Sequence, residues 1–446
     1  MGGIGYVSQL VALLIANVHD VNWMVNHHLV RVFCGEAGVI GHLVHSVGDG
    51  LISLLYCEVT NHVRLRPSIS NLPFSVLMPP MSVTDNTPPA HDKALFTACY
   101  KQVPADFRVD EQMDIEHDGS GEHLYLRISK TGMNTNELVS LLEEAYSVRS
   151  QDVGLSGMKD RHAITSQWFS ITTPKEVDTF QLVLENSNTE HKHAQIVDSR
   201  RHSRKLRRGA HTANAFVITL RDIQPSDNLT AADVIEGVTS RLDSLDKSGF
   251  PNYIGPQRFG FGGQNLVRAR QWFRQPRKRA SRQQRSLWLS AGRSAIFNAV
   301  CAGRVNQGSW QTILPGEPAI LDGTRSFFDT QGSSGEELAE RLQRFDIHPS
   351  APWWGRGASL AQSECAEFEN QILANYDDVC AGLDRAGLTQ ERRAIRAQVY
   401  ALTHQWIDDT TLELSFSLSP GVFATTLLRE LGVCREPEQR QFDTER

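Results

Sequence analysis

The feature that most constrains the fold of this chain is the stretch at residues 154–170, which reads GLSGMKDRHAITSQWFS. Its first half is a glycine-led turn that carries Lys159 and Asp160, and the apolar, β-prone run WFSI follows at residues 168–171. A Lys-Asp pair after glycine is most often a solvated turn. The turn followed by the apolar run predicts a loop that holds Asp160 and leads into a strand.

Length and composition indicate a globular protein of more than one domain. Because single cores rarely grow past about 250 to 300 residues, a chain of 446 residues corresponds to about two to three domains. The composition is 40% hydrophobic and 22% charged, typical of a soluble protein, and no apolar run reaches the roughly 20 residues of a membrane helix. The seven cysteines are scattered without a Cys-x-x-Cys pair, which argues against a zinc site and favours a reducing, cytoplasmic location.

Basic residues are concentrated in two acid-free runs, although the formal net charge is -6. Residues 247–316 contain 12 Lys or Arg and no Asp or Glu, and residues 199–221 form a second acid-free run. One such run would ordinarily be a solvated face, but two in an acidic protein favour a surface that binds a polyanion, with affinity that falls steeply with salt. The candidate phosphate-binding side chains are Arg204, Lys205, Arg207, Arg208, Arg258, Arg277, Lys278 and Arg279.

Residues 1–92 differ from the rest of the chain. They contain no lysine, and six of the 16 histidines fall before His91. The short apolar run at residues 6–18 has no preceding basic residue and no small-x-small cleavage site, so it makes a poor signal peptide. We expect native translation to start at Met81 or Met78, with the upstream stretch a start-site artefact. A real, poorly ordered extension is the alternative.

From Lys101 onward the pattern is that of a folded α+β domain. Apolar and polar residues alternate as in half-buried strands at residues 107–111, 122–129, 215–220 and 411–418. Helices are expected from a cap at Asn134 or Thr135, at residues 230–245 and at residues 422–431, with Gly432 as a C-terminal cap.

A segment with a different pattern separates these parts, beginning near PNYIGPQRFG at residues 251–260. Helices are predicted at residues 265–273, 286–304, 335–345 and 361–384 without matching strand runs, so the segment reads as a helix-rich insert. The glycine cluster at residues 260–263 is a weak candidate for a phosphate loop, because no strand precedes it. The expected division is a leader (1–92), a domain in two parts (93–253 and 401–446) and an inserted domain (254–400).

Three segments resemble motifs of the TruD family of tRNA pseudouridine synthases. The second and third are residues 251–260 and 420–431, and the match extends over roughly residues 101–431. In the first, Ser156 stands where the family usually has alanine, and the matching positions are Gly157, Lys159, Asp160, Ala163, Thr165 and Gln167. The resemblance implies a pseudouridine synthase catalytic domain with a mixed β-sheet, interrupted by an inserted TruD-type domain, which acts on uridine 13 of tRNA without a cofactor. We expect a monomer with tRNA as its partner, and no metal or membrane.

The implied reaction explains why these residue types would be needed. Pseudouridine formation breaks the bond between uracil N1 and ribose C1′ and rejoins the base through C5. A carboxylate suits it because its ordinary pKa of about 3.9 leaves it ionised at neutral pH, and the resemblance gives this role to Asp160, acting at C1′ or at C6. The uridine must first be flipped out of the RNA, and stacking on aromatic rings offsets the cost. The family's active-site aromatics match Phe107, Phe216 and Phe423, for each of which core packing is the alternative.

Two polar residues complete the expected site. Lys101 lies six residues before Phe107, the spacing of the family's active-site lysine, and is expected to keep Asp160 charged or to meet a phosphate; an ordinary surface lysine is the alternative. Asn214 matches the asparagine of a family Gly-Asn-x-Phe, with Ala213 in place of glycine, and is expected to position the aspartate or a base edge. Lys159 is expected to serve local structure.

Two alternatives stay open. The enzyme could act on a different RNA, or the chain could be an RNA-binding or RNA-folding protein in which catalysis is secondary or lost. The intact motif around Asp160 argues against lost catalysis.

Overall fold

The computed structural model describes residues 87–91, 93–116, 118–275 and 279–437, together with four strands in the preceding part of the chain. The chain divides into two compact units, Met1–Met81 and Ser82–Arg446. In the first unit, one antiparallel sheet contains, in order, β1 (Phe33–Cys34), β2 (Val39–His45), β3 (Ile52–Glu58) and β4 (Arg66–Ser68). The other expectations for residues 1–86, including the start site, lie outside the described residues.

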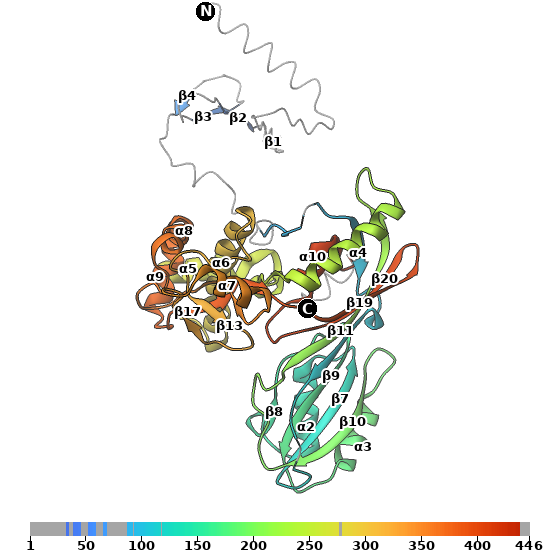
Figure 1. Ribbon diagram of the computed structural model, residues 1–446. Coiled ribbons are helices and arrows are strands. Elements are labelled where there is room, and N and C mark those ends of the chain that lie inside the picture. Colours follow the sequence, from blue (N-terminus) through green and yellow to red (C-terminus); the bar gives the residue numbers. More distant parts are fainter. Residues whose placement is uncertain are drawn as a thin grey trace, which may run out of the picture. The chain divides into compact units, whose positions relative to one another are not determined.

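The second unit is built on a large mixed β-sheet (Figure 1). Its strands run in the order β10-β7-β9-β6-β11-β20-β19. They are β6 (Phe107–Gln112), β7 (His123–Thr131), β9 (Ile164–Thr172), β10 (His193–His202), β11 (Ala213–Pro225), β19 (Tyr400–Asp408) and β20 (Thr411–Leu418). Strands β6 and β9 are parallel, whereas the other neighbours on this path are antiparallel. The prediction of an α+β fold with a mixed sheet is confirmed.

Three short strands extend this sheet. Strand β8 (Val153–Leu155) pairs with β9, and β5 (Phe96–Tyr100) pairs with β11. Strand β5 also pairs in parallel with β21 (Val433–Arg435), so that Cys99 lies opposite Arg435. The residues that follow these two strands, Lys101 and Glu436, are therefore neighbours although they lie far apart in the sequence.

Helices α2 (Thr135–Tyr146) and α3 (Asp178–Ser187) pack against the part of the sheet formed by β7, β8, β9 and β10. As expected, Asn134 caps α2, because its side chain accepts a hydrogen bond from the Glu137 backbone nitrogen at 2.9 Å. Leu138 and Leu142 of this helix are fully buried in the core. This core holds β8, β9 and the connection between them in place.

Helices α4 (Ala231–Ser248) and α10 (Ala424–Leu431) pack against the other part of the sheet, on β5, β6, β11 and β20. Gly432 follows α10, but its φ of -168° is extended and not left-handed as in the usual glycine cap. A Cβ added at Gly432 would lie 2.5 Å from the Phe96 carbonyl oxygen. Close packing against β5, rather than the cap geometry, therefore requires a glycine here.

The segment between residues 252 and 395 contains five helices within its described residues. They are α5 (Gln264–Arg274), α6 (Arg282–Asn306), α7 (Gly335–Gln343), α8 (Ser363–Leu373) and α9 (Asp377–Arg385). The buried residues of α6 pack with α5, α8 and α9. The prediction of one helix at residues 361–384 is wrong, because Tyr376 leaves helical geometry with φ of -126° and ψ of 17° and separates α8 from α9. No helix in the described part of the chain combines the length and the apolar character needed to span a membrane.

This segment also contains short strands, which the sequence pattern did not predict. One small sheet contains β13 (Ala319–Leu321), β14 (Phe327–Phe328) and β15 (Ile347–His348), and β16 (Ser350–Trp353) pairs with β17 (Glu391–Ala394). Runs this short show no visible alternation of apolar and polar residues. At the base of the segment, β12 (Phe250–Pro251) pairs antiparallel with β18 (Arg396–Ala397), so its two ends lie side by side.

Candidate active site

A pocket of about 300 Å³ lies where segments far apart in the sequence meet. The residues expected in the active site all line it, namely Lys101, Phe107, Asp160, Asn214, Phe216 and Phe423. Tyr100, Met158 and Glu436 also contribute to its wall. The structure thus brings the predicted residues together, and the chemical role of each remains a prediction.

Asp160 lies in the loop between β8 and β9, and buried side chains hold the backbone of this loop. Thr135 Oγ1 accepts a hydrogen bond from the Lys159 backbone nitrogen at 2.9 Å, and Gln167 Nε2 donates to the Gly157 carbonyl at 2.9 Å. Thr135 Oγ1 also donates to Gln167 Oε1 at 3.1 Å. Because Thr135 and Gln167 are both fully buried, this network fixes the loop that presents Asp160.

Lys130 ties the same loop to β7. Its Nζ donates to the backbone carbonyls of Met133 at 2.7 Å and of Asp160 at 2.6 Å. The side chain is 1% exposed, and burial lowers the pKa of Lys130 to about 8. A buried ammonium group therefore positions the backbone of the candidate catalytic residue.

Lys101 is a buried side chain, in contrast to the surface lysine of the alternative interpretation. Its Nζ lies 3.1 Å from Asp160 Oδ2, 3.3 Å from Glu436 Oε1 and 4.3 Å from the centre of the Phe107 ring. The Lys101 backbone has a left-handed φ of 58°, uncommon for a residue with a Cβ, where the chain leaves β5. Since the Asp160 side chain is 38% exposed, the carboxylate keeps access to the pocket beside this cation.

Tyr100 adds a second polar group to this wall. Burial, and the negative charge of Glu436 beside it, raise the pKa of the Tyr100 hydroxyl. The hydroxyl therefore stays protonated and can donate a hydrogen bond.

The three phenylalanines contribute in two ways. The rings of Phe107 and Phe216 meet edge to face with centres 6.1 Å apart, and Phe216 stacks on Phe416 at 5.4 Å. Phe107 and Phe216 are buried, so they combine core packing with pocket lining. Phe423 is half-buried and lies across Gly255, where an added Cβ would be 2.9 Å from its Cδ1. Its ring is the most accessible of the three for stacking.

Lys159 belongs to a buried polar cluster beneath the loop. Its Nζ lies 3.2 Å from Glu111 Oε2 and donates to Asn214 Oδ1. The Glu111 side chain is fully buried, and the Trp168 backbone nitrogen donates to its Oε1 at 3.2 Å. Burial raises the pKa of Glu111, although Lys159 and the Trp168 hydrogen bond act in the opposite direction. Asn214 is thereby joined to the Asp160 loop through Lys159.

Comparison with known proteins decides the family. The family model of tRNA pseudouridine synthase D (TruD) matches residues 92–267 and 263–431. The tRNA pseudouridine synthase D of Xanthomonas campestris pv. campestris (strain B100) is 42% identical over 365 residues, which cover 79% of this chain and 96% of that one. That of Methylococcus capsulatus is 40% identical over 347 residues, covering 78% and 94%. The chain belongs to the TruD family of tRNA pseudouridine synthases, which are isomerases.

A solved structure of a TruD protein from Methanosarcina mazei shares the fold, with a TM-score of 0.60 and 17% identity over 78% of this chain and 97% of that one. The fold of this TruD chain is thus similar to that of an experimental structure.

Four polar residues of the TruD site were not predicted from the sequence. They are Tyr100, Glu111, Lys130 and Glu436. Glu111 and Lys130 lie in strands β6 and β7, where the alternation of apolar and polar residues is visible in the sequence. A charged residue at a position that faces the core is unusual, and this could have marked both residues as candidates. Glu436 gave no such signal, because its place beside Lys101 depends on the pairing of β5 with β21.

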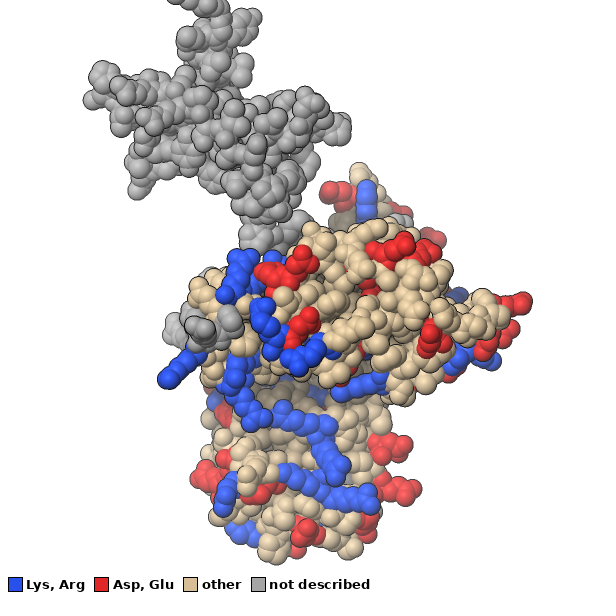
Figure 2. Space-filling model, turned by 90° about the vertical axis from the view of Figure 1, so that its left-hand side faces the viewer, with Lys and Arg blue, Asp and Glu red and all other residues tan. Residues whose placement is uncertain are grey.

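Basic side chains gather around a hollow between the upper and lower parts of the face seen in Figure 2. Of the predicted phosphate-binding residues, Lys205 is half-buried and Arg204, Arg207, Arg208, Arg258 and Arg279 are exposed. Arg277 and Lys278 lie outside the described residues. Other members of the basic runs have partners within the chain, such as Arg200 with Asp198 at 3.1 Å and Arg274 with Asp378 at 3.3 Å. The runs therefore divide into paired residues and residues open to a polyanion.

Proposed function

We propose that this TruD protein converts uridine 13 of tRNA into pseudouridine, with Asp160 as the catalytic carboxylate. The position of Asp160 is the main support for this proposal. Asp160 lies on a fixed loop in a pocket lined by Phe107, Phe216 and Phe423. Lys101 Nζ is 3.1 Å from its carboxylate. The position within the tRNA rests on the family resemblance.

In the proposed reaction the target uridine leaves the RNA stack and enters the pocket. Stacking on an aromatic ring, worth about 1 to 3 kcal/mol for a base, offsets part of the cost of flipping. Asp160 acts at C1′ or at C6, the N1–C1′ bond breaks, the base turns, and a C5–C1′ bond forms. The proton that leaves C5 is balanced by the one gained at N1, so the product is an isomer of the substrate.

The proposed function also assigns a role to each part of the chain around the pocket. Residues 93–253 and 401–446 form the catalytic domain, residues 254–400 form the inserted domain, and tRNA lies against the basic side chains of both. Pro256 and Gln257, close to the start of the insert, line the pocket and support this arrangement. We infer that the protein acts on tRNA as a monomer in the cytoplasm.

A pair of RNA transcripts tests the assignment of substrate. We expect an unmodified tRNA to gain pseudouridine at position 13, and the same tRNA with cytidine at position 13 to gain none, by mapping of modified positions. Pseudouridine at another uridine in both transcripts would move the target elsewhere in the RNA. Tight binding without any pseudouridine would favour an RNA-binding or RNA-folding protein.

Replacement of Lys101 with methionine should slow the reaction without preventing binding. Because a hydrogen bond to a charged group contributes about 1.5 to 3 kcal/mol, the single-turnover rate at saturating tRNA should fall by about 10- to 150-fold. The exposed Lys93, changed to methionine, is the matched control and should keep the wild-type rate. An unchanged rate in folded K101M would remove Lys101 from the mechanism.

A further inference from the structure

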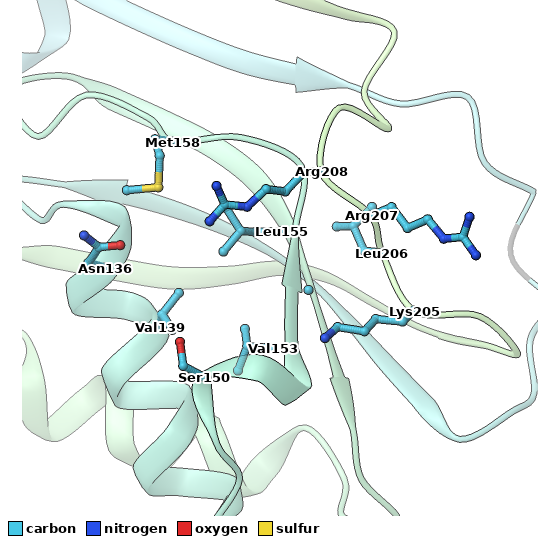
Figure 3. A pocket seen from close by; sticks show the side chains of 11 residues that line it. Asn136, Val139, Ser150, Val153, Leu155, Met158, Lys205, Leu206, Arg207 and Arg208 are labelled. Carbon is cyan, nitrogen blue, oxygen red and sulfur yellow. The ribbon is translucent and has the colours of Figure 1, made fainter. Parts of the chain in front are cut away.

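A second pocket, of about 370 Å³ (Figure 3), shares the lining residue Met158 with the candidate active site. Part of its wall is apolar, formed by Val139 on α2, Val153 and Leu155 on β8, and Leu206. Polar groups surround this apolar surface, and they belong to Asn136, Ser150, Lys205, Arg207 and Arg208. The lining contains cationic side chains and no acidic ones.

The basic side of this pocket has a fixed backbone. The Tyr125 hydroxyl donates to the Arg204 carbonyl at 3.0 Å, and the Leu206 backbone nitrogen donates to Ser170 Oγ at 2.9 Å. Beyond the two arginines, the Gly209 backbone nitrogen donates to the Ser156 carbonyl at 2.9 Å. Arg207 and Arg208 therefore project from a short segment that is tied to the sheet on one side and to the loop after β8 on the other.

The basic side chains around this pocket point in different directions. In Figure 3, Arg208 reaches across the pocket between Met158 and Leu155, and the Lys205 amine lies near Val153, whereas Arg207 points away. Lys205 Nζ donates to the Gln151 carbonyl, which leaves two of its three protons for another acceptor. Arg208 and Lys205 thus place positive charge beside the apolar part of the cavity.

Met158 joins this pocket to the candidate active site, because it lines both. Its side chain is 54% exposed, unusual for a large apolar residue and consistent with a surface that a ligand covers. Met158 and Asp160 are two residues apart, so their Cα atoms are separated by at most about 7 Å. A molecule in the second pocket would lie within one or two nucleotides of a uridine bound at Asp160.

We propose that this pocket binds a second unstacked nucleotide of the RNA substrate, a near neighbour of the target uridine in the strand. Its base packs on Val139, Val153 and Leu206, its edge meets Asn136 and Ser150, and its phosphate meets Lys205 and Arg208. This inference rests on the proposed function. It explains how the strand around an extruded uridine is kept open, because a neighbour held in its own pocket cannot restack.

The charge and size of the pocket favour a nucleotide of an RNA over a free anion. A volume near the lower end of the usual range for ligand sites suits one nucleotide. The cations stand at the rim, beside the exposed Arg204 and Arg207, where a continuing phosphate backbone would pass.

The test fills the pocket without altering the core. Ser150 is exposed, its hydroxyl points into the pocket in Figure 3, and Ser150→Trp would occupy the space of a base. Ser140→Trp, on the exposed side of α2 and outside both pockets, is the matched control. We expect S150W to raise the Kd for an unmodified tRNA transcript about 10- to 150-fold, the range for loss of one buried apolar group, and S140W to leave it unchanged.

Transcripts with a single abasic site, placed in turn at each of the positions flanking the target uridine, identify the nucleotide. One of them should raise the Kd for wild type to a similar extent and have no further effect on S150W, since both changes remove the same contact. An equal Kd for S150W and wild type would overturn the proposal, while pseudouridine formation by wild type would leave the proposed function standing. Coupled losses without any pseudouridine formation would support the pocket and refute the proposed function.

Two small probes separate the possible sources of the ligand. Calorimetry with inorganic phosphate and with uridine monophosphate should show weak binding at most. Tight binding of either probe that S150W abolishes, with tRNA affinity unchanged, would identify a site for a free anion and overturn the proposal.

Discussion

Asp160→Asn is expected to abolish pseudouridine formation while leaving tRNA binding intact. The substitution keeps the shape of the side chain and removes the negative charge, so the single-turnover rate at saturating tRNA should fall by about 10⁴-fold or more. The variant should fold, because Lys101 keeps its contact with Glu436 Oε1 at 3.3 Å and the side chain of residue 160 remains partly exposed. The tRNA Kd should therefore stay close to that of wild type.

The exposed Asp114, changed to asparagine, provides the matched control for loss of one carboxylate in the same domain. It should retain the wild-type rate. A folded D160N that reacts as fast as wild type would exclude Asp160 from the chemistry. If wild type and D160N both bind tRNA and neither forms pseudouridine, the RNA-binding interpretation gains support.

Lys159→Met is expected to cause a large loss of stability. The Lys159 side chain is 6% exposed and its Nζ lies 3.2 Å from Glu111 Oε2, in a side chain that is fully buried. Removing one partner of such a pair leaves the other charge uncompensated and typically costs about 3 to 5 kcal/mol. Urea unfolding of the protein, followed by tryptophan fluorescence, should show this loss relative to wild type.

The double variant Glu111→Gln with Lys159→Met should recover most of that loss. The glutamine can still accept the hydrogen bond from the Trp168 backbone nitrogen, and no buried charge remains. A double variant as unstable as K159M would show that packing of the lysine stem, and not the charge of Glu111, determines the loss.

The loss should also depend on pH in a defined direction. Burial raises the folded-state pKa of Glu111, and removal of Lys159 raises it further, so the folded protein binds a proton more readily than the unfolded chain does. The contribution of Glu111 to stability is therefore fully present below its unfolded pKa of about 4.3 and is lost as the pH rises through the folded pKa. The deficit of K159M should be smaller near pH 4 than near pH 8, and a deficit independent of pH would contradict this account.

Much of the catalytic fold could be predicted because its strands alternate visibly and its helices carry ordinary caps. Strand β20 and the cap at Asn134 follow from residues close together in the chain. The short strands of the inserted segment could not be predicted, since two to four residues carry too little pattern. At the break between α8 and α9, Tyr376 packs against residues of α5 and α9, a contact that no local pattern predicts.

The candidate site also contains residues that the sequence could predict and residues that it could not. The motif around Asp160 directed attention to six residues that line one pocket, whereas spacing alone could not separate a buried Lys101 from a surface lysine. Its partner Glu436 lies 335 positions away and becomes a neighbour only through the β5–β21 pairing. Lys130 stands 30 positions from the Asp160 carbonyl that it holds. These contacts depend on the order and pairing of strands in the sheet, so no local sequence pattern predicts them.

The pairing of Phe250–Pro251 with Arg396–Ala397 has a consequence for how such proteins can diverge. The segment between these two dipeptides can be treated as one long loop of the large sheet, and the β12–β18 pairing holds the two ends of this loop together. Loop-closure entropy changes by only about 0.6 kcal/mol for each doubling of length, so the intervening segment can grow, shrink or be exchanged at little cost to the catalytic fold. Evolution can therefore change the segment between residues 252 and 395 while the register of the strands around Asp160 stays the same.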